Sequence, residues 1–124
     1  MNEEIKILLC EDEEFVARSY VRKLQVEGYT VLRAHNGKEG LELMRSERPN
    51  LVLLDLLMPV KSGFEVLKEV QNDPELKDIK IVVTSNLGQK SDIEEATKLG
   101  AHDFLVKSNT SLRELSEKVK EYLS

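Results

Sequence analysis

The sequence is poor in cysteine and in long apolar segments, and each absence excludes a class of protein. Its single cysteine, Cys10, permits neither an internal disulfide nor a zinc site built from cysteines. No apolar segment approaches the roughly 20 residues that a membrane-spanning helix requires. Residues 1–4 include two glutamates, whereas a secretory signal would begin with basic residues. We therefore expect a soluble, cytoplasmic protein that does not bind membranes.

Basic residues do not outnumber acidic ones in this chain. It has 18 lysines and arginines against 23 aspartates and glutamates, for a formal net charge of −5. A nucleic acid-binding protein needs a basic face to neutralise phosphates, so we expect no direct nucleic acid binding by this domain. The sequence has no internal repeat, low-complexity stretch or linker, and 124 residues suffice for one hydrophobic core. We expect a single domain over residues 1–124.

Short apolar segments alternate with segments of helical spacing along the chain. The apolar segments predict strands at residues 5–10, 30–34, 51–55, 79–84 and 102–106. Helices are expected over residues 14–27, 37–47, 64 to about 73, 91–100 and 111–123. Phe15 belongs to the apolar pattern of the first helix, and Ser91 with Glu94 resembles a capping box for the fourth. Thr110 or Ser111 would cap the last helix.

This alternation of strands and helices predicts an α/β fold. Five β-α units with short connections form a parallel sheet with helices on both faces. We expect a flavodoxin-like, doubly wound sheet of five strands in the order 2-1-3-4-5, with five helices. In such sheets ligands bind beyond the carboxyl ends of the strands, where the strand order reverses. That point lies between the first and third strands.

Charged and polar residues end the strands at this edge of the sheet. Glu11 and Asp12 follow the first strand, and Asp55 ends the third. Ser85 follows the fourth strand and Lys107 follows the fifth. Two carboxylates ~4 Å apart repel by ~4 kcal/mol at an effective dielectric near 20. Either one acid holds a proton at a raised pKa, or a divalent cation lies among them.

The residue types at this edge suit phosphoryl chemistry. Oxygen ligands with room for water favour Mg²⁺, which commonly shares phosphate oxygens with the protein. Asp55 can act as a nucleophile toward phosphorus and form an acyl phosphate. The cation and Lys107 would then hold the equatorial oxygens. The sequence thus predicts a phosphoryl-binding site.

Four stretches of the sequence follow one another with distinctive spacing: Ile7–Glu13, Leu53–Pro59 with Gly63, Val83–Asn86 and Phe104–Lys107. Asp55 and Ser85 are 30 positions apart, and Ser85 and Lys107 are 22 apart. In these stretches and spacings the chain resembles the receiver domain of two-component response regulators over essentially its whole length. Each stretch alone is weak, but four at this spacing are specific.

The resemblance implies a role for each matching residue of the site. Asp55 would be the phosphoacceptor. Glu11 and Asp12 would form the acidic pair of the Mg²⁺ site, joined by the Asp55 side chain and the backbone carbonyl of Leu57. Lys107 would contact the phosphoryl oxygens.

Further residues would transmit or time the signal in the same family. Ser85 resembles the switch hydroxyl, with Thr84 as a rival that the spacing disfavours. Phe104 resembles the aromatic residue whose rotamer reports activation on the surface of the fourth helix, fifth strand and fifth helix. Leu57 and Leu87 occupy positions that tune dephosphorylation, where many family members carry a polar residue that can orient the attacking water. Leucine cannot do so, and the two leucines therefore imply a longer-lived phosphoryl group.

The chain departs from the family pattern at two further positions. Ser108 follows Lys107 where most members have proline, often after a cis bond, and a non-proline cis bond costs ~2.5–4 kcal/mol. Phe104 lacks the hydroxyl of a tyrosine, so no hydrogen bond would lock its inward state.

The implied function is a signalling domain rather than a dedicated metabolic enzyme. A histidine kinase or a histidine phosphotransfer protein would donate the phosphoryl group. A downstream protein target or effector domain would recognise the switched surface, and the family allows a phosphorylation-dependent dimer. The sequence ends with the expected fifth helix, so we expect no effector domain within it.

Two other functions fit parts of the pattern. A haloacid dehalogenase-type phosphatase would carry its nucleophile after the first strand in an Asp-x-Asp motif, whereas Asp55 ends the third strand and Leu57 replaces the second aspartate. A flavodoxin-like cofactor carrier needs a phosphate loop after the first strand, where residues 11–14 are acidic. Taken alone, Glu11 and Asp12 would be helix amino-terminal acids favoured by the helix dipole.

Overall fold

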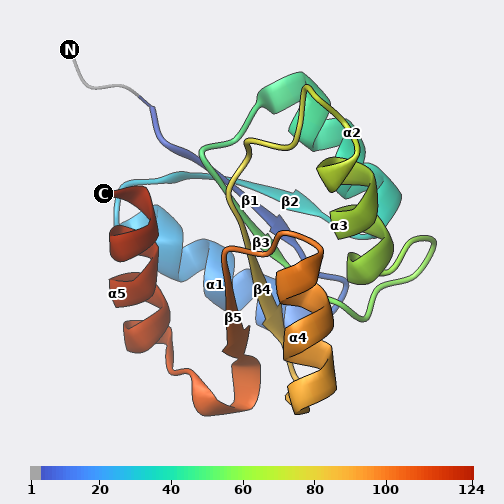
Figure 1. The fold of residues 1–124 in the computed structure, drawn as a ribbon. Coiled ribbons are helices and arrows are strands. Elements are labelled where there is room, and N and C mark those ends of the chain that lie inside the picture. The colour runs from blue at the N-terminus through green and yellow to red at the C-terminus, as the bar shows by residue number, and fades with distance from the viewer. Residues whose placement is uncertain (1–3) are drawn as a thin grey trace.

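The computed structural model describes residues 4–124, and it confirms the predicted five-stranded parallel sheet in the order β2-β1-β3-β4-β5 (Figure 1). Residues 1–3 lie outside this description. They make up most of the amino-terminal segment whose acidic character argues against a secretory signal. The strands are β1 (Lys6–Cys10), β2 (Thr30–Ala34), β3 (Leu51–Leu54), β4 (Ile81–Ser85) and β5 (Asp103–Val106). The helices are α1 (Glu14–Val26), α2 (Gly37–Glu47), α3 (Gly63–Gln71), α4 (Lys90–Lys98) and α5 (Leu112–Leu123), with a 3₁₀ turn at Lys107–Asn109.

Helices cover both faces of the sheet, as continuous apolar strands require. Alternate residues of β1 point to opposite faces, so Ile7 and Leu9 pack with α1 and α5, whereas Leu8 and Cys10 pack with α2 and α3. Figure 1 shows the two layers, with α1 and α5 on one side of the sheet. The central strand β3 is buried along its whole length.

Two glycines allow helices to pack closely against the ends of strands. An added Cβ at Gly40 of α2 would lie 2.8 Å from the Cys10 sulfur, so the helix passes directly over the thiol. Burial raises the pKa of the Cys10 thiol to about 12. An added Cβ at Gly63 would collide with the carbonyl oxygen of Asp55, and glycine therefore lets α3 begin against the end of β3.

The predicted capping box at Ser91 and Glu94 is wrong. Helix α4 begins at Lys90 after Gln89, and no side chain caps it. The Gln89 carbonyl accepts from the amides of Asp92 and Ile93, which places Ser91 inside the first turn. Ser111, and not Thr110, caps α5 through a reciprocal pair with Glu114.

Phe15 does not join the buried face of α1, contrary to the apolar pattern, because that face consists of Ala17, Tyr20 and Leu24. The Phe15 side chain is 84% exposed. Strand boundaries differ from the prediction by one or two residues, a usual uncertainty at element ends.

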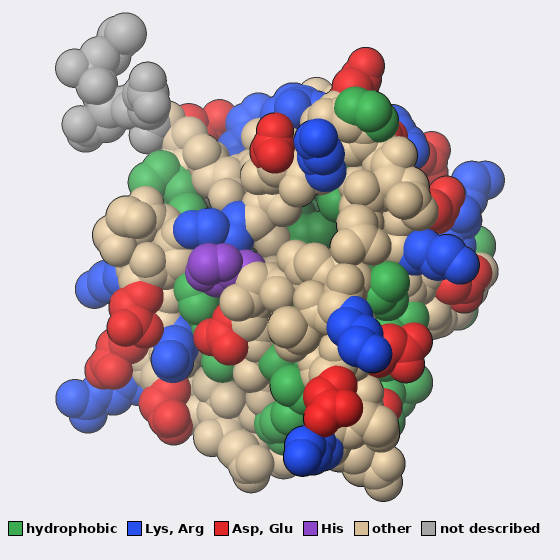
Figure 2. Space-filling view, in the orientation of Figure 1, with side chains coloured by type: hydrophobic (Ala, Val, Ile, Leu, Met, Phe, Trp, Pro, Cys, Tyr) green, Lys and Arg blue, Asp and Glu red, His purple; other side chains and the backbone are tan. Residues whose placement is uncertain are grey.

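The peptide bonds of residues 4–124 are all trans, including that between Lys107 and Ser108. The Ser108 amide donates to the side-chain oxygen of Asn86 at 3.0 Å, a bond that proline could not make. None of the helices described is long and apolar enough to cross a bilayer. The face over α4, β5 and α5 carries intermixed acidic and basic side chains with scattered hydrophobic ones (Figure 2).

Candidate functional site

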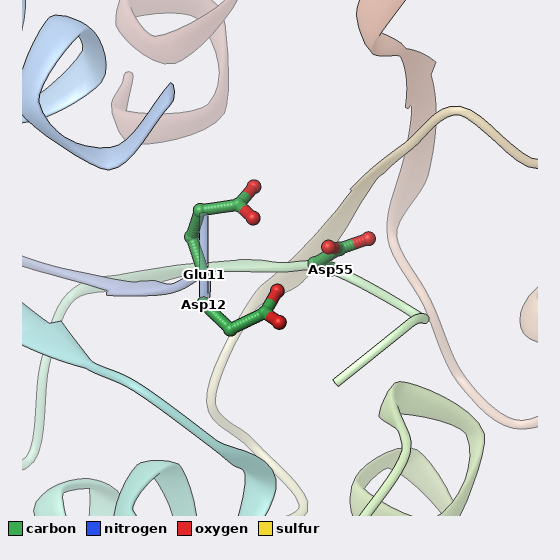
Figure 3. A group of neighbouring side chains, drawn as sticks. All are labelled: Glu11, Asp12 and Asp55. Carbon is green, nitrogen blue, oxygen red and sulfur yellow. The ribbon is translucent and has the colours of Figure 1, made fainter. Parts of the chain in front are cut away.

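Three carboxylates converge at the carboxyl edge of the sheet, between β1 and β3. Glu11 and Asp12 follow β1, Asp55 follows β3, and each offers an oxygen within 4.8 Å of the others (Figure 3). The Asp55 amide donates to the Cys10 carbonyl at 3.1 Å, which extends the β1–β3 ladder by one residue. The topological switch point and the acidic cluster therefore coincide, as the sequence predicted.

A single ammonium group joins two of these carboxylates across the sheet. The Lys107 Nζ donates to Glu11 and, at 3.2 Å, to Oδ2 of Asp55. Glu11 is fully buried, Asp55 is 5% exposed, and Asp12 is exposed. Buried charges require partners, and one lysine cannot neutralise three carboxylates. If all three acids are ionised, the site has a net charge of about −2, which a divalent cation would balance.

Burial and pairing act in opposite directions on the titration of this cluster. Burial raises the pKa of Glu11 above its usual range, the hydrogen bond from Lys107 opposes this, and the charge of Asp55 adds to it. Burial lowers the pKa of Lys107, but the hydrogen bond to Glu11 and the charge of Asp55 outweigh that effect and leave its pKa raised. Lys107 therefore stays cationic at neutral pH.

The three carboxylates differ in the hydrogen bonds that their oxygens already accept. Glu11 accepts from Lys107 through Oε1 and from the Glu13 amide through Oε2, at 3.1 Å for the latter. The Oδ1 of Asp55 accepts from the Leu57 amide at 3.3 Å. Asp12 is the exposed member of the cluster, and its carboxylate is therefore the most accessible to a cation from solvent.

A cleft of about 280 Å³ opens onto the cluster. It is large enough for a hydrated ion or a phosphoryl group. The sequence did not predict that Asn86 lines this cleft, although Asn86 follows Ser85 at the same edge of the sheet. The lining residues are Asp12, Glu13, Asp55, Leu57, Asn86 and Lys107.

The two candidate switch hydroxyls on β4 have different environments. Ser85 ends the strand, is fully buried, and accepts from the Leu87 amide at 3.2 Å. Thr84 is also buried, but its hydroxyl has no hydrogen-bond partner among the described residues. Alternation places Thr84 on the face of Val82, toward α1 and α5, and Ser85 on the opposite face.

Phe104 lies on the same face as Ser85, on the neighbouring strand. It pairs in register with Val83, while Ser85 pairs with Val106. Phe104 is half-buried and packs against the core cluster on the α2–α4 side, as does Leu87. Ser85 and Phe104 are thus diagonal neighbours, two residues apart in register, on one side of the β4–β5 pair.

Comparison with known proteins identifies the family of this chain. Residues 7–120 match the family model of the response regulator receiver domain. The chain belongs to the response regulator receiver family. This receiver is 32% identical over 117 residues to the polar-differentiation response regulator DivK of Brucella anthropi, and the match covers 94% of each chain.

Other relatives are longer proteins. The receiver is 36% identical over 118 residues to the probable transcriptional regulator ycf27 of Porphyridium aerugineum, of which it spans about half the length (48%). Among solved structures, the Vibrio cholerae chemotaxis protein CheY4 has a TM-score of 0.89 and 26% identity, covering 98% of this chain and 100% of its own. The family is one of signalling domains, which argues against the phosphatase and cofactor-carrier alternatives.

Proposed function

We propose that this receiver accepts a phosphoryl group on Asp55, in a transfer that requires Mg²⁺, and that residues 1–124 work as one such domain. The observation that carries the proposal is the nearly buried Asp55 carboxylate, held by Lys107 and within 4.8 Å of the other two acids. Its opening to the 280 Å³ cleft leaves access for a phosphodonor.

The transfer uses groups already placed in the site. An Asp55 oxygen attacks the phosphorus of a phosphohistidine, a P–O bond forms, and the P–N bond breaks. The donor imidazole leaves with the electron pair and takes up a proton. Lys107, freed from its bond to Asp55, donates to a phosphoryl oxygen, and Glu11 keeps its ammonium in place.

The donor set fits Mg²⁺. Asp12, Asp55 and the Leu57 carbonyl would hold it directly, and Glu11 would complete the acidic pair mainly through its charge, because both its oxygens already accept hydrogen bonds. When bound, the cation supplies positive charge that offsets the charge of the phosphoryl oxygens.

Phosphorylation would switch the surface formed by α4, β5 and α5. The Ser85 hydroxyl turns from the Leu87 amide toward the phosphoryl group, and Phe104 moves inward on the same face of the sheet. A switch needs a group that contacts one state more favourably than the other, and the phosphoryl oxygens supply that difference through Ser85.

The lifetime of the phosphoryl group would depend on two leucines. Leu57 is exposed beside the cleft, and Leu87 is partly buried against the core. Neither side chain can hydrogen-bond an attacking water, so hydrolysis lacks the orientation that a polar residue would give.

The phosphodonor would be a histidine kinase or a histidine phosphotransfer protein, and the switched surface would bind a downstream protein. Family membership and the location of Asp55 at an open cleft support this assignment of partners. The receiver would act as a relay and not as a dedicated metabolic enzyme.

One experiment tests the proposal. Incubation with acetyl phosphate and Mg²⁺ should add one phosphoryl group to the wild type and none to Asp55→Asn, measured by intact mass spectrometry. Asp78→Asn, an exposed aspartate outside the cluster, is the matched control and should be labelled like the wild type. Full labelling of Asp55→Asn, or labelling that persists in EDTA, would overturn the proposal.

A further inference from the structure

Arg33 lies beside the acidic site without belonging to it. It is the fourth residue of the edge strand β2 and pairs in register with Leu9 of β1. Alternation along β2 places it on the face of Val31, toward α1. Its side chain is only 16% exposed, although β2 is at the edge of the sheet.

The guanidinium of Arg33 binds the segment that joins β1 to α1. Its Nε and Nη2 donate to the Glu11 carbonyl at 3.2 and 3.0 Å, and Nη2 also lies 3.4 Å from the Asp12 carbonyl. Its Nη1 donates to the Glu14 carboxylate at 2.7 Å. The Glu11 amide donates to the Ala34 carbonyl at 3.0 Å, so β2 binds both the backbone N–H and the backbone C=O of Glu11.

We propose that Arg33 is a positioning residue for the divalent-cation site. It fixes the backbone carbonyls of Glu11 and Asp12, the residues whose side chains enter the acidic cluster, and so directs the exposed Asp12 carboxylate toward Asp55. The inference rests on the proposed function, because it concerns the cation that phosphoryl transfer would use.

The charge of Arg33 and its positioning act in opposite directions, which makes the inference testable. A fixed cation close to the cluster repels Mg²⁺, so charge alone predicts that removing Arg33 tightens Mg²⁺ binding. Positioning predicts that removal weakens it, since partners that orient metal ligands typically contribute about 10- to 100-fold in affinity. The sign of the change therefore separates the two effects.

The experiment compares Mg²⁺ titrations, followed by amide chemical shifts, of the wild type, Arg33→Met and Arg33→Lys. Both variants should bind Mg²⁺ about 10-fold more weakly, because lysine keeps the charge but lacks the planar fork that serves two carbonyls and Glu14 together. Arg22→Met is the matched control: it removes an exposed positive charge from the neighbouring helix and should leave the affinity unchanged.

A second measurement applies to the metal-free protein. Hydrogen exchange at the amides of Glu11 and Glu13 should quicken in Arg33→Met, while exchange at the Leu115 amide of α5 should stay as in the wild type. Faster exchange at all three amides would indicate general destabilisation and overturn the specific role.

The outcomes distinguish this inference from the proposed function. If the wild type binds Mg²⁺ and both folded Arg33 variants bind it equally well or more tightly, the positioning role is wrong and the site itself stands. If the wild type binds no Mg²⁺, the proposed function is wrong. The positioning role of Arg33 is then also wrong, because there is no cation site to position.

Discussion

Thr84 is a buried polar side chain whose hydroxyl lacks a partner among the described residues. A buried hydroxyl without a hydrogen bond costs roughly 1–3 kcal/mol. Thr84→Val keeps the shape and removes the hydroxyl, so we expect the free energy of unfolding to rise by about 1 kcal/mol. Urea denaturation in the presence of EDTA measures this change in the free energy of unfolding.

The control for this substitution is Thr97→Val on α4. The Thr97 hydroxyl donates to the Ile93 carbonyl at 2.7 Å and is exposed, so its removal should bring no gain. A loss of stability in Thr84→Val would mean that the Thr84 hydroxyl has a hydrogen-bond partner in solution.

The central acids of the site could be predicted from the sequence, whereas their supporting residues could not. Asp55 and Glu11 end apolar strands, and parallel strands end at one edge, so their meeting follows from topology. Arg33 donates to the Glu11 carbonyl, and Asn86 lines the cleft while accepting from the Ser108 amide. Both placements depend on strand register and loop path. A lone arginine at the end of an edge strand carries no such signal in the sequence.

Among the helices, three segments share the Ser-x-x-Glu pattern, and only two of them form capping boxes. Ser62 caps α3 and Ser111 caps α5, while Ser91 lies inside the first turn of α4. Loss of a capping serine typically costs about 1 kcal/mol. Ser111→Ala should therefore lower the free energy of unfolding by that amount, and Ser91→Ala, as the control, should leave it nearly unchanged in thermal or urea denaturation.

An equal loss in both variants would mean that Ser91 caps α4 in solution. The structural difference between the segments lies upstream of the pattern. The chain leaving β4 brings the Gln89 carbonyl within reach of the Asp92 and Ile93 amides, and the helix starts before Ser91 can cap it. The number of strands and helices followed from apolar periodicity, and the strand order followed from the doubly wound topology expected of five β-α units. Helix starts depend instead on how each loop leaves the sheet.

At the scale of the whole molecule, several of the exposed apolar side chains lie close to the acidic site. Phe15 of α1 and Leu112 of α5 line a cleft of about 370 Å³, and Lys107 and Asn86 line both this cleft and the acidic one. Under the proposed function, we expect a protein donor that brings its phosphohistidine to Asp55 to cover this area. Phe15→Ala should therefore slow phosphorylation by a cognate histidine kinase several-fold while leaving the rate with acetyl phosphate unchanged.

The matched control for Phe15→Ala is Val26→Ala, an exposed apolar residue at the other end of α1. It should change neither rate in a radiolabel or mass-spectrometric time course. Equal slowing with both donors in Phe15→Ala would place the effect in the chemistry of the site and not in docking.

Because Cys10 is buried beneath α2, the reactivity of its thiol reports how often that helix separates from the sheet. It is the one thiol in the sequence, and both its enclosure and its raised pKa keep it unreactive while α2 stays on the sheet. A thiol reagent would modify only molecules in which that helix has lifted. The labelling rate therefore reports openings that lift α2 from the sheet, without an engineered cysteine, and can be compared before and after phosphorylation.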